Sequence, residues 1–215
     1  MICRAVIFDC DGVIVDSEPA TFELLSQDFA EYGLSLSADQ IAHDFIGGTM
    51  AGVADMARAR GADLPADWVG SFYEKLYARL ATETPLVPGI LHVLDTLDQH
   101  QIPYAVGSNG SDEKMQVTLG QHTGLIPRFK GRLFSGQTLG KPKPAPDLYL
   151  HVAKVLGVAP EFCVVVEDSA TGCAAAAAAG IRCFGYAAQD DGARLAAKGA
   201  VVFHDMADLP TLLGL

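Results

Sequence analysis

Acidic side chains gather in two short segments that lie far apart in the sequence. The first reads Asp9-Cys10-Asp11, and the second is Glu167-Asp168. Because no matching set of histidine or cysteine ligands accompanies them, these carboxylates suit a hard divalent cation, and Mg2+ is the obvious candidate. A carboxylate beside such a cation can attack phosphorus and form an aspartyl-phosphate. A second carboxylate two residues along can donate a proton to the leaving group and then activate water.

Two further segments offer groups that bind anions. Ser108 opens a Ser-Asn-Gly turn, and its hydroxyl and the backbone N–H groups of Asn109 and Gly110 lie where a helix is expected to begin, which is a natural anion site. Lys143 offers a point charge that suits a phosphoryl oxygen. Taken singly, each of these residues is more often a turn or solvated-loop residue. Their combination in four separate segments favours a phosphate-handling site.

Short apolar runs precede most of these polar residues and predict buried strands. The expected strands are 4–9, 103–107, 132–135, 162–166, 181–186 and 200–203, and the expected helices between them include 112–122, 146–156 and 169–179. Strands that alternate with helices predict an α/β fold with a doubly wound parallel sheet. Ligands bind such sheets at the carboxyl ends of the strands, so the polar segments should converge on one edge.

Residues 17–85 break this alternation. Apolar residues recur there at helical spacing, as in Phe22, Leu25 and Phe29, and no convincing strand is present. A helical insert after the first strand is the simplest account. We therefore expect a sheet domain formed by residues 1–16 and 86–215 and a helical domain formed by residues 17–85, with Pro88-Gly89 near the return hinge.

Composition narrows the classes of partner. The chain has 215 residues, half of them hydrophobic, and a formal net charge of −11. This charge argues against nucleic acid or an anionic membrane as a partner but allows a small anionic substrate at a local positive site. The five cysteines form no CxxC pair, so neither a disulfide framework nor a zinc site is expected. Without a signal peptide or an apolar run of membrane-spanning length, a cytoplasmic monomer or weak homo-oligomer is the expectation.

These segments together resemble the motifs of the haloacid dehalogenase-like (HAD) hydrolase superfamily. Residues 9–17, Asp-Cys-Asp-Gly-Val-Ile-Val-Asp-Ser, resemble its first motif, and Ser108 its second. Residues 143–147, Lys-Pro-Ala-Pro-Asp, resemble the third, and residues 167–169, Glu-Asp-Ser, the fourth. Four motifs in order cover essentially the whole chain. The resemblance implies a Rossmann-like core with a small helical cap, as in the subgroup of β-phosphoglucomutase-like enzymes and sugar-phosphate phosphatases.

The resemblance also implies roles for the acidic residues. Asp9 would be the nucleophile and a magnesium ligand, and Asp11 the general acid and base, which also binds magnesium through its main-chain carbonyl. Asp168 would bind the metal directly, and Glu167 would act through water or through a hydrogen bond to a group that binds the metal. The family thereby links all four carboxylates to one Mg2+ ion.

The phosphoryl group would be held by Ser108, Asn109 and Lys143, and Lys143 would also act in catalysis. Lys141 is the alternative lysine, but the Lys-Pro-x-Pro-Asp pattern begins at Lys143. Positive charge from metal and lysine together neutralises the transferring group. The resemblance therefore implies an Mg2+-dependent phosphatase acting on a small phosphorylated metabolite. A sugar phosphate or a sugar-acid phosphate such as phosphogluconate is the first candidate, since residues around Lys114 and 133–136 resemble phosphatases of phosphogluconate-like compounds.

A phosphosugar mutase is the main alternative. The β-phosphoglucomutase pattern has a histidine where this chain has Thr21, and an arginine where residues 47–51 read Gly-Gly-Thr-Met-Ala. Both differences favour hydrolysis. A dehalogenase is disfavoured, because its chemistry needs no second acid like Asp11. A phosphoacceptor receiver domain is also disfavoured, because such domains are shorter and lack the insert. A dinucleotide-binding sheet is not expected, because no G-x-G-x-x-G follows a strand. Polar residues of the insert that could face the substrate are Thr49, Lys75, Arg79 and His43.

Overall fold

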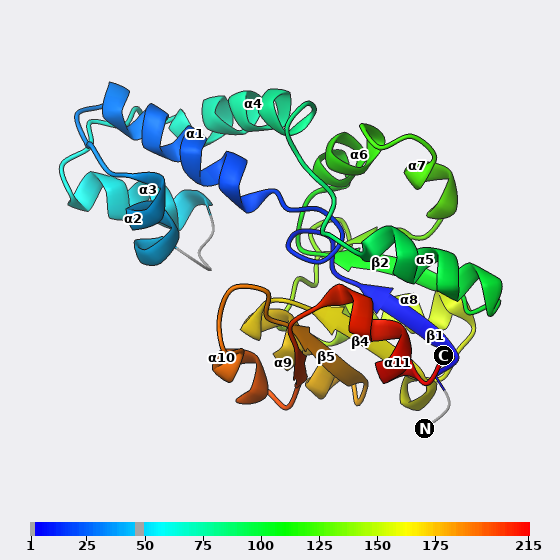
Figure 1. Ribbon diagram of the computed structural model, residues 1–215. Coiled ribbons are helices and arrows are strands. Elements are labelled where there is room, and N and C mark those ends of the chain that lie inside the picture. Colours follow the sequence, from blue (N-terminus) through cyan, green and yellow to red (C-terminus); the bar gives the residue numbers. More distant parts are fainter. Residues whose placement is uncertain (1–2, 46–49) are drawn as a thin grey trace. The chain divides into compact units, whose positions relative to one another are not determined.

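A six-stranded parallel sheet forms the centre of the larger unit of the protein (Figure 1). The computed structural model describes residues 3–45 and 50–215. The sheet has the order β3-β2-β1-β4-β5-β6. Its strands are β1 (Ala5–Phe8), β2 (Tyr104–Ser108), β3 (Leu133–Ser135), β4 (Cys163–Glu167), β5 (Arg182–Tyr186) and β6 (Val201–Phe203). The predicted doubly wound parallel sheet is confirmed, and each strand lies within two residues of its expected position.

The central strand β1 supplies side chains to two hydrophobic cores. Successive residues point to opposite faces, so Val6 and Phe8 join one core while Ala5 and Ile7 join the other. All four residues are fully buried. Because both faces are covered, this strand reads as a continuous apolar run, as expected for a parallel sheet.

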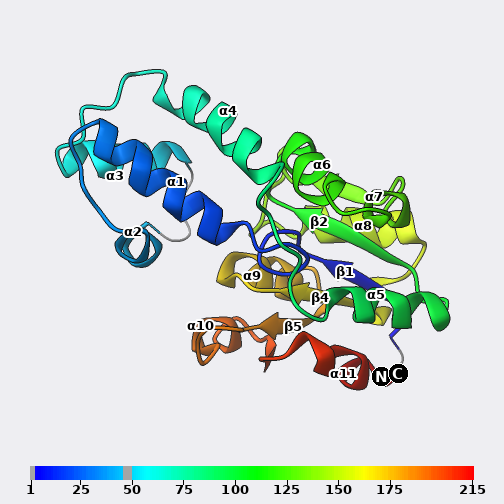
Figure 2. The same ribbon diagram turned by 45° about the horizontal axis from the view of Figure 1, so that its top comes forward.

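Helices cover both faces of the sheet (Figure 2). The first core contains side chains of α5 (Ile90–Gln99), α6 (Asp112–Gly120), α7 (Leu125–Arg128) and α11 (Leu209–Leu213). The second core contains side chains of α8 (Asp147–Leu156), α9 (Ala170–Ala178) and α10 (Ala193–Ala196). In the alanine-rich α9, Cys173, Ala175 and Ala176 are fully buried, since small side chains let the helix pack closely on β4 and β5.

Residues Ser17–Thr84 form a second compact unit, and Met1–Asp16 with Pro85–Leu215 form the first. The second unit begins where the expected insert begins and ends one residue earlier, at Thr84. Its described elements are α1 (Glu18–Glu31), α2 (Ala38–Asp44), α3 (Met50–Ala59) and α4 (Trp68–Leu80). Among the residues described in either unit, none of the helices is both long and apolar enough to cross a bilayer.

An aromatic stack and a buried carboxylate hold the helical unit together. The Trp68 ring stacks on Phe29 and Phe72, with ring centroids 5.6 and 4.9 Å apart. Asp28, on α1, is only 3% exposed and accepts hydrogen bonds from the Trp68 indole N–H and the Lys75 ammonium. Since a buried charge is costly unless paired, these two bonds fix the position of α1 against α4.

Replacing Asp28 with alanine should therefore destabilise the helical unit. The buried Trp68 N–H would lose its acceptor, and the free energy of unfolding should fall by about 2 kcal/mol. Trp68 is the only tryptophan of the chain, so its fluorescence during urea denaturation reports on this unit. The matched change at the exposed Asp63 should alter stability by less than about 0.5 kcal/mol. Equal effects of the two substitutions would contradict the assigned role of Asp28.

Candidate active site

The polar segments converge at the carboxyl ends of β1, β2 and β4, which are neighbouring strands. Phe8 at the end of β1 lies opposite Val106 of β2 and Val166 of β4. Asp9 therefore leaves the sheet next to Glu167, the last residue of β4, and near Ser108, the last residue of β2. Residues separated by more than 150 positions are thus brought to one edge by parallel pairing alone.

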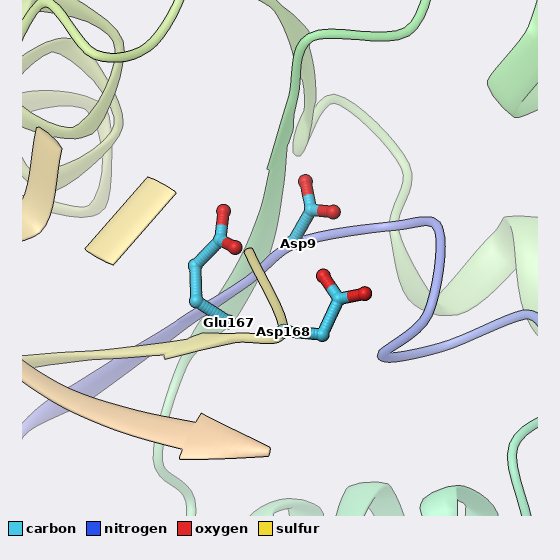
Figure 3. A group of neighbouring side chains, drawn as sticks. All are labelled: Asp9, Glu167 and Asp168. Atoms are coloured by element: carbon cyan, nitrogen blue, oxygen red, sulfur yellow. The ribbon is translucent and has the colours of Figure 1, made fainter. Parts of the chain in front are cut away.

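Three carboxylates form an acidic cluster at this edge. Asp9, Glu167 and Asp168 each have a carboxylate oxygen within 4.8 Å of those of the other two. Figure 3 shows the three side chains extending from two adjacent strand ends into the same region. Carboxylate oxygens at this spacing fit a hard divalent cation. Asp9 and Asp168 are close enough to share one ion, which the proposed chemistry requires.

Lys143 inserts its ammonium group between two of these carboxylates. Its Nζ lies 2.6 Å from Asp9 Oδ1 and 2.6 Å from Glu167 Oε1, and its side chain is 3% exposed. The same ammonium lies 5.0 Å from the ring centroid of Tyr149, a residue of α8 that the sequence interpretation did not select. The buried lysine thereby joins the loop before α8 to the ends of β1 and β4.

Glu167 has little capacity left for a metal ion. Its Oε1 accepts from Lys143 Nζ and, at 2.7 Å, from the Tyr149 hydroxyl. Its Oε2 accepts from the backbone N–H and the hydroxyl of Ser169, at 2.9 and 2.8 Å. With four donors on two oxygens, Glu167 serves to hold the lysine, and Asp9 and Asp168 are the better direct ligands.

Burial and the lysine oppose each other in setting the charges of this cluster. Burial raises the pKa of Asp9 to about 7, against the attraction of Lys143. For Glu167, burial would also raise the pKa, but Lys143 and the bonds from Ser169 and Tyr149 outweigh it and lower the pKa below its usual value. The pKa of Lys143 is raised, because Asp9 and Glu167 outweigh the effect of burial. These directions favour the charged forms of Glu167 and Lys143, while an added cation would favour the charged form of Asp9.

Two glycines leave the space that the acidic residues occupy. Gly12 has a φ of 77°, and a Cβ there would lie 2.0 Å from Asp168 Oδ2. A Cβ at Gly172, in the first turn of α9, would lie 1.7 Å from Glu167 Oε1. Neither position can carry a side chain without displacing a carboxylate of the site.

The Ser-Asn-Gly turn is organised by its own side chains. Ser108 is 2% exposed, and its Oγ accepts from the Gly110 N–H at 2.9 Å. The Asn109 side chain binds the backbone of Lys143, accepting from its N–H at 2.8 Å and donating to its carbonyl at 3.1 Å. Asn109 thus positions the lysine loop with its side chain, which leaves its main-chain N–H as the group able to meet an anion.

A second lysine lies beside Asp11. Lys114 Nζ is 2.8 Å from Asp11 Oδ1, and the two side chains are 20% and 24% exposed. Lys114 is the third residue of α6, the helix that follows the Ser-Asn-Gly turn. The resemblance drew attention to the segment around Lys114 but did not assign the lysine to the site. Its place in the first turn of a helix that starts at the sheet edge is the signal that could have identified it.

The remaining predicted residues either lie in the helical unit or are exposed on the surface of the sheet unit. Lys75 pairs with Asp28 and Glu31, Arg79 with Glu23 and Glu83, and His43 with Asp44, so each has partners within its own unit. Thr21 donates its hydroxyl to the Ser17 carbonyl at 2.7 Å. Thr49 and the Gly-Gly-Thr part of residues 47–51 lie outside the described residues. Lys141, the alternative to Lys143, is exposed.

Gly172→Ala should cost stability that a matched substitution does not. The new methyl group would displace the buried Glu167 carboxylate, and the free energy of unfolding should fall by about 3 kcal/mol or more. Gly70 is also the third residue of its helix, α4, but has nothing within 4 Å of an added Cβ. Gly70→Ala should leave stability unchanged or raise it by up to about 1 kcal/mol. Urea unfolding followed by circular dichroism compares the two, and a tolerated Gly172→Ala would disprove the close packing.

Known proteins are similar to this chain over most of its length. A family model described as haloacid dehalogenase-like hydrolase matches residues 3–180. The 6-phosphogluconate phosphatase of Escherichia coli (strain K12) is 30% identical over 211 residues, which cover 97% of this chain and 94% of that protein. Hexitol phosphatase A of the same organism is 33% identical over 198 residues, covering 91% and 88%.

A solved structure of the same family is similar to this chain in both fold and sequence. The crystal structure of a HAD family hydrolase from Deinococcus radiodurans R1, with bound phosphate and sodium, matches with a TM-score of 0.85 and 33% identity, covering 99% of this chain and 95% of that one. The family model extends over strands β1 to β4, the acidic cluster and the insert, and the 6-phosphogluconate phosphatase and the solved structure match nearly the whole chain. The chain therefore belongs to the haloacid dehalogenase-like hydrolase family.

Proposed function

We propose that this protein is an Mg2+-dependent phosphatase that hydrolyses a small phosphorylated metabolite through an aspartyl-phosphate on Asp9. The 2.6 Å contact between Lys143 Nζ and Asp9 Oδ1 carries this proposal. It joins a nucleophilic oxygen to a phosphate-binding cation beside an acidic cluster, which is the combination that phosphoryl transfer needs. The names of the two Escherichia coli relatives support a sugar phosphate or a sugar-acid phosphate as the substrate.

The chain offers donors for each part of the phosphoryl group. Two of the three N–H donors of Lys143 meet Asp9 and Glu167, which leaves the third for a phosphoryl oxygen. The Ser108 hydroxyl and the main-chain N–H of Asn109 would bind the other oxygens. These groups would hold the phosphorus in line with the Asp9 carboxylate before reaction.

The acidic cluster would hold the metal ion. Asp9 and Asp168 would bind Mg2+ with side-chain oxygens and Asp11 with its main-chain carbonyl, while Glu167 supports the site through Lys143. When bound, Mg2+ supplies positive charge that offsets the negative charge of the carboxylates and of the transferring group.

The reaction would proceed in two displacements at phosphorus. In the first, an Asp9 oxygen bonds to phosphorus as the ester P–O bond breaks, and the Asp11 carboxyl group gives its proton to the leaving oxygen. In the second, the Asp11 carboxylate takes a proton from water as that water attacks phosphorus. The bond to Asp9 breaks, inorganic phosphate leaves, and both carboxyl groups regain their starting states.

We further propose that the helical unit Ser17–Thr84 acts as a cap domain, as in the relatives that the sequence resembles. Its described lysine and arginine candidates, Lys75 and Arg79, already have acidic partners in their own unit. They are therefore weak candidates for substrate recognition. Groups of the sheet unit near Asp11 become the better place to look for recognition of the leaving group.

Phosphate release from a panel of phosphomonoesters tests the proposal. The panel contains 6-phosphogluconate, glucitol 6-phosphate, 2-phosphoglycolate and β-glucose 1-phosphate. Activity should require Mg2+, disappear with EDTA and return with excess Mg2+. Asp9→Asn keeps the shape of the side chain but removes the nucleophile, so kcat should fall by a factor on the order of 1,000 or more. No hydrolysis of any ester, or isomerisation of the hexose 1-phosphate with a bisphosphate primer, would refute the phosphatase.

Lys143→Met and Lys141→Met remove the same charge two residues apart. Lys143→Met should lower kcat/KM by about 100- to 1,000-fold, because it removes a donor to the transferring phosphoryl group. Lys141 is exposed, and its substitution should change kcat/KM by less than about twofold. Circular dichroism checks that both variants are folded. A larger loss in Lys141→Met would transfer the phosphate-binding role to that residue.

A further inference from the structure

Lys114 lies beside the residue that handles the leaving group. Its Nζ is 2.8 Å from Asp11 Oδ1. If Asp11 protonates the leaving oxygen, as the proposed function requires, the substrate atoms bonded to that oxygen must lie within a few ångströms of this carboxylate. The Lys114 ammonium then lies close to the leaving group, whereas Lys143 contacts Asp9 and Glu167 and has its remaining donor directed to the phosphoryl group.

Gly110 lies beside Lys114, Asp11 and Ser108. A Cβ at Gly110 would lie 3.3 Å from Ser108 Oγ, 3.6 Å from Asp11 Oδ2 and 3.6 Å from Lys114 Cδ. The lysine stem, the Asp11 carboxylate and the Ser108 hydroxyl therefore all lie close to one backbone position in the turn that is proposed to bind phosphate.

Lys114 differs from Lys143 in its access to solvent. The Lys114 side chain is 20% exposed, compared with 3% for Lys143. Its ammonium has three donors, of which one meets Asp11 in the described contacts. The four-carbon stem is flexible, so the ammonium can reach a ligand group a few ångströms from its present position.

We infer that Lys114 is a specificity-determining residue that binds an acidic group of the leaving moiety, so that the preferred substrates are phosphate esters of hydroxy acids. This inference rests on the proposed function and narrows its substrate class. The chain carries a net charge of −11, which disfavours a substrate with a second anionic group unless a local cation receives it. Lys114 is such a cation, on the leaving-group side of the site.

Two matched pairs of substrates test this role. The pairs are 6-phosphogluconate with glucitol 6-phosphate, and 2-phosphoglycolate with 2-hydroxyethyl phosphate. In each pair a carboxylate is replaced by a CH2OH group at the same position. The wild-type protein should prefer the acid by about 10- to 100-fold in kcat/KM in at least one pair, as expected for a charge-assisted hydrogen bond. Lys114→Met should abolish most of that preference, and Lys114→Arg should keep it.

The ratio within a pair separates recognition from positioning. If Lys114 only orients Asp11, its substitution slows the acid and the alcohol equally, because both leaving oxygens need the same proton. Equal slowing would overturn the inference, and so would a wild-type protein without any preference for the acid. Either result leaves the phosphatase proposal intact, since phosphate is still released; no release from any ester would instead refute the proposed function.

Binding measurements test the same inference in variants that no longer hydrolyse the substrates. Calorimetric titration of each pair into Asp9→Asn protein gives the alcohol-to-acid ratio of Kd without reaction. Adding Lys114→Met should reduce that ratio by about tenfold or more. Lys154→Met, on the exposed surface of α8, removes the same charge and should leave the ratio unchanged. An unaltered ratio in the Lys114→Met protein would overturn the inference.

Discussion

The buried ion pair of Lys143 with Asp9 and Glu167 is the interaction on which the rest of the site depends. Parallel pairing of β1 with β4 forces two carboxylates together at positions that are 8% and 0% exposed. Such a pair is tolerated only with a cation between its members. Lys143 comes from a loop that is distant in sequence. The Asn109 side chain positions this loop through hydrogen bonds to both the N–H and the carbonyl of Lys143.

The sheet and the acidic edge could be predicted from sequence because both follow from the change between apolar and polar residues within short segments. A buried strand such as β1 is a short apolar run, and the first polar residue after it marks its carboxyl end. Parallel order then brings the ends together without any knowledge of side-chain contacts. The division into a sheet unit and a helical unit follows from the same reasoning, since the change of apolar period is visible near Ser17.

The remaining features depend on which surfaces meet, and single-sequence patterns do not contain that information. Tyr149 reaches Glu167 only because α8 packs beneath the site, and Lys114 reaches Asp11 only because α6 starts at the sheet edge. The sequence shows that residue 172 is a glycine, but it does not show that the Glu167 carboxylate occupies the space beside Gly172. In the same way, Arg79 looks like a candidate for substrate binding until its partners are known, which are Glu23 on α1 and Glu83 four residues further along the chain.

The chain leaves and re-enters the sheet unit through a short antiparallel ribbon. Val15 is bridged to Leu86, the Asp16 N–H donates to the Pro85 carbonyl at 2.9 Å, and the Val87 N–H donates to the Ile14 carbonyl at 2.9 Å. Both ends of the intervening segment are thus clamped by the sheet unit itself. Closing a loop between fixed, adjacent ends costs little extra free energy as the loop grows. Changes in length or sequence between Asp16 and Pro85 should therefore leave the sheet unit and its acidic cluster assembled.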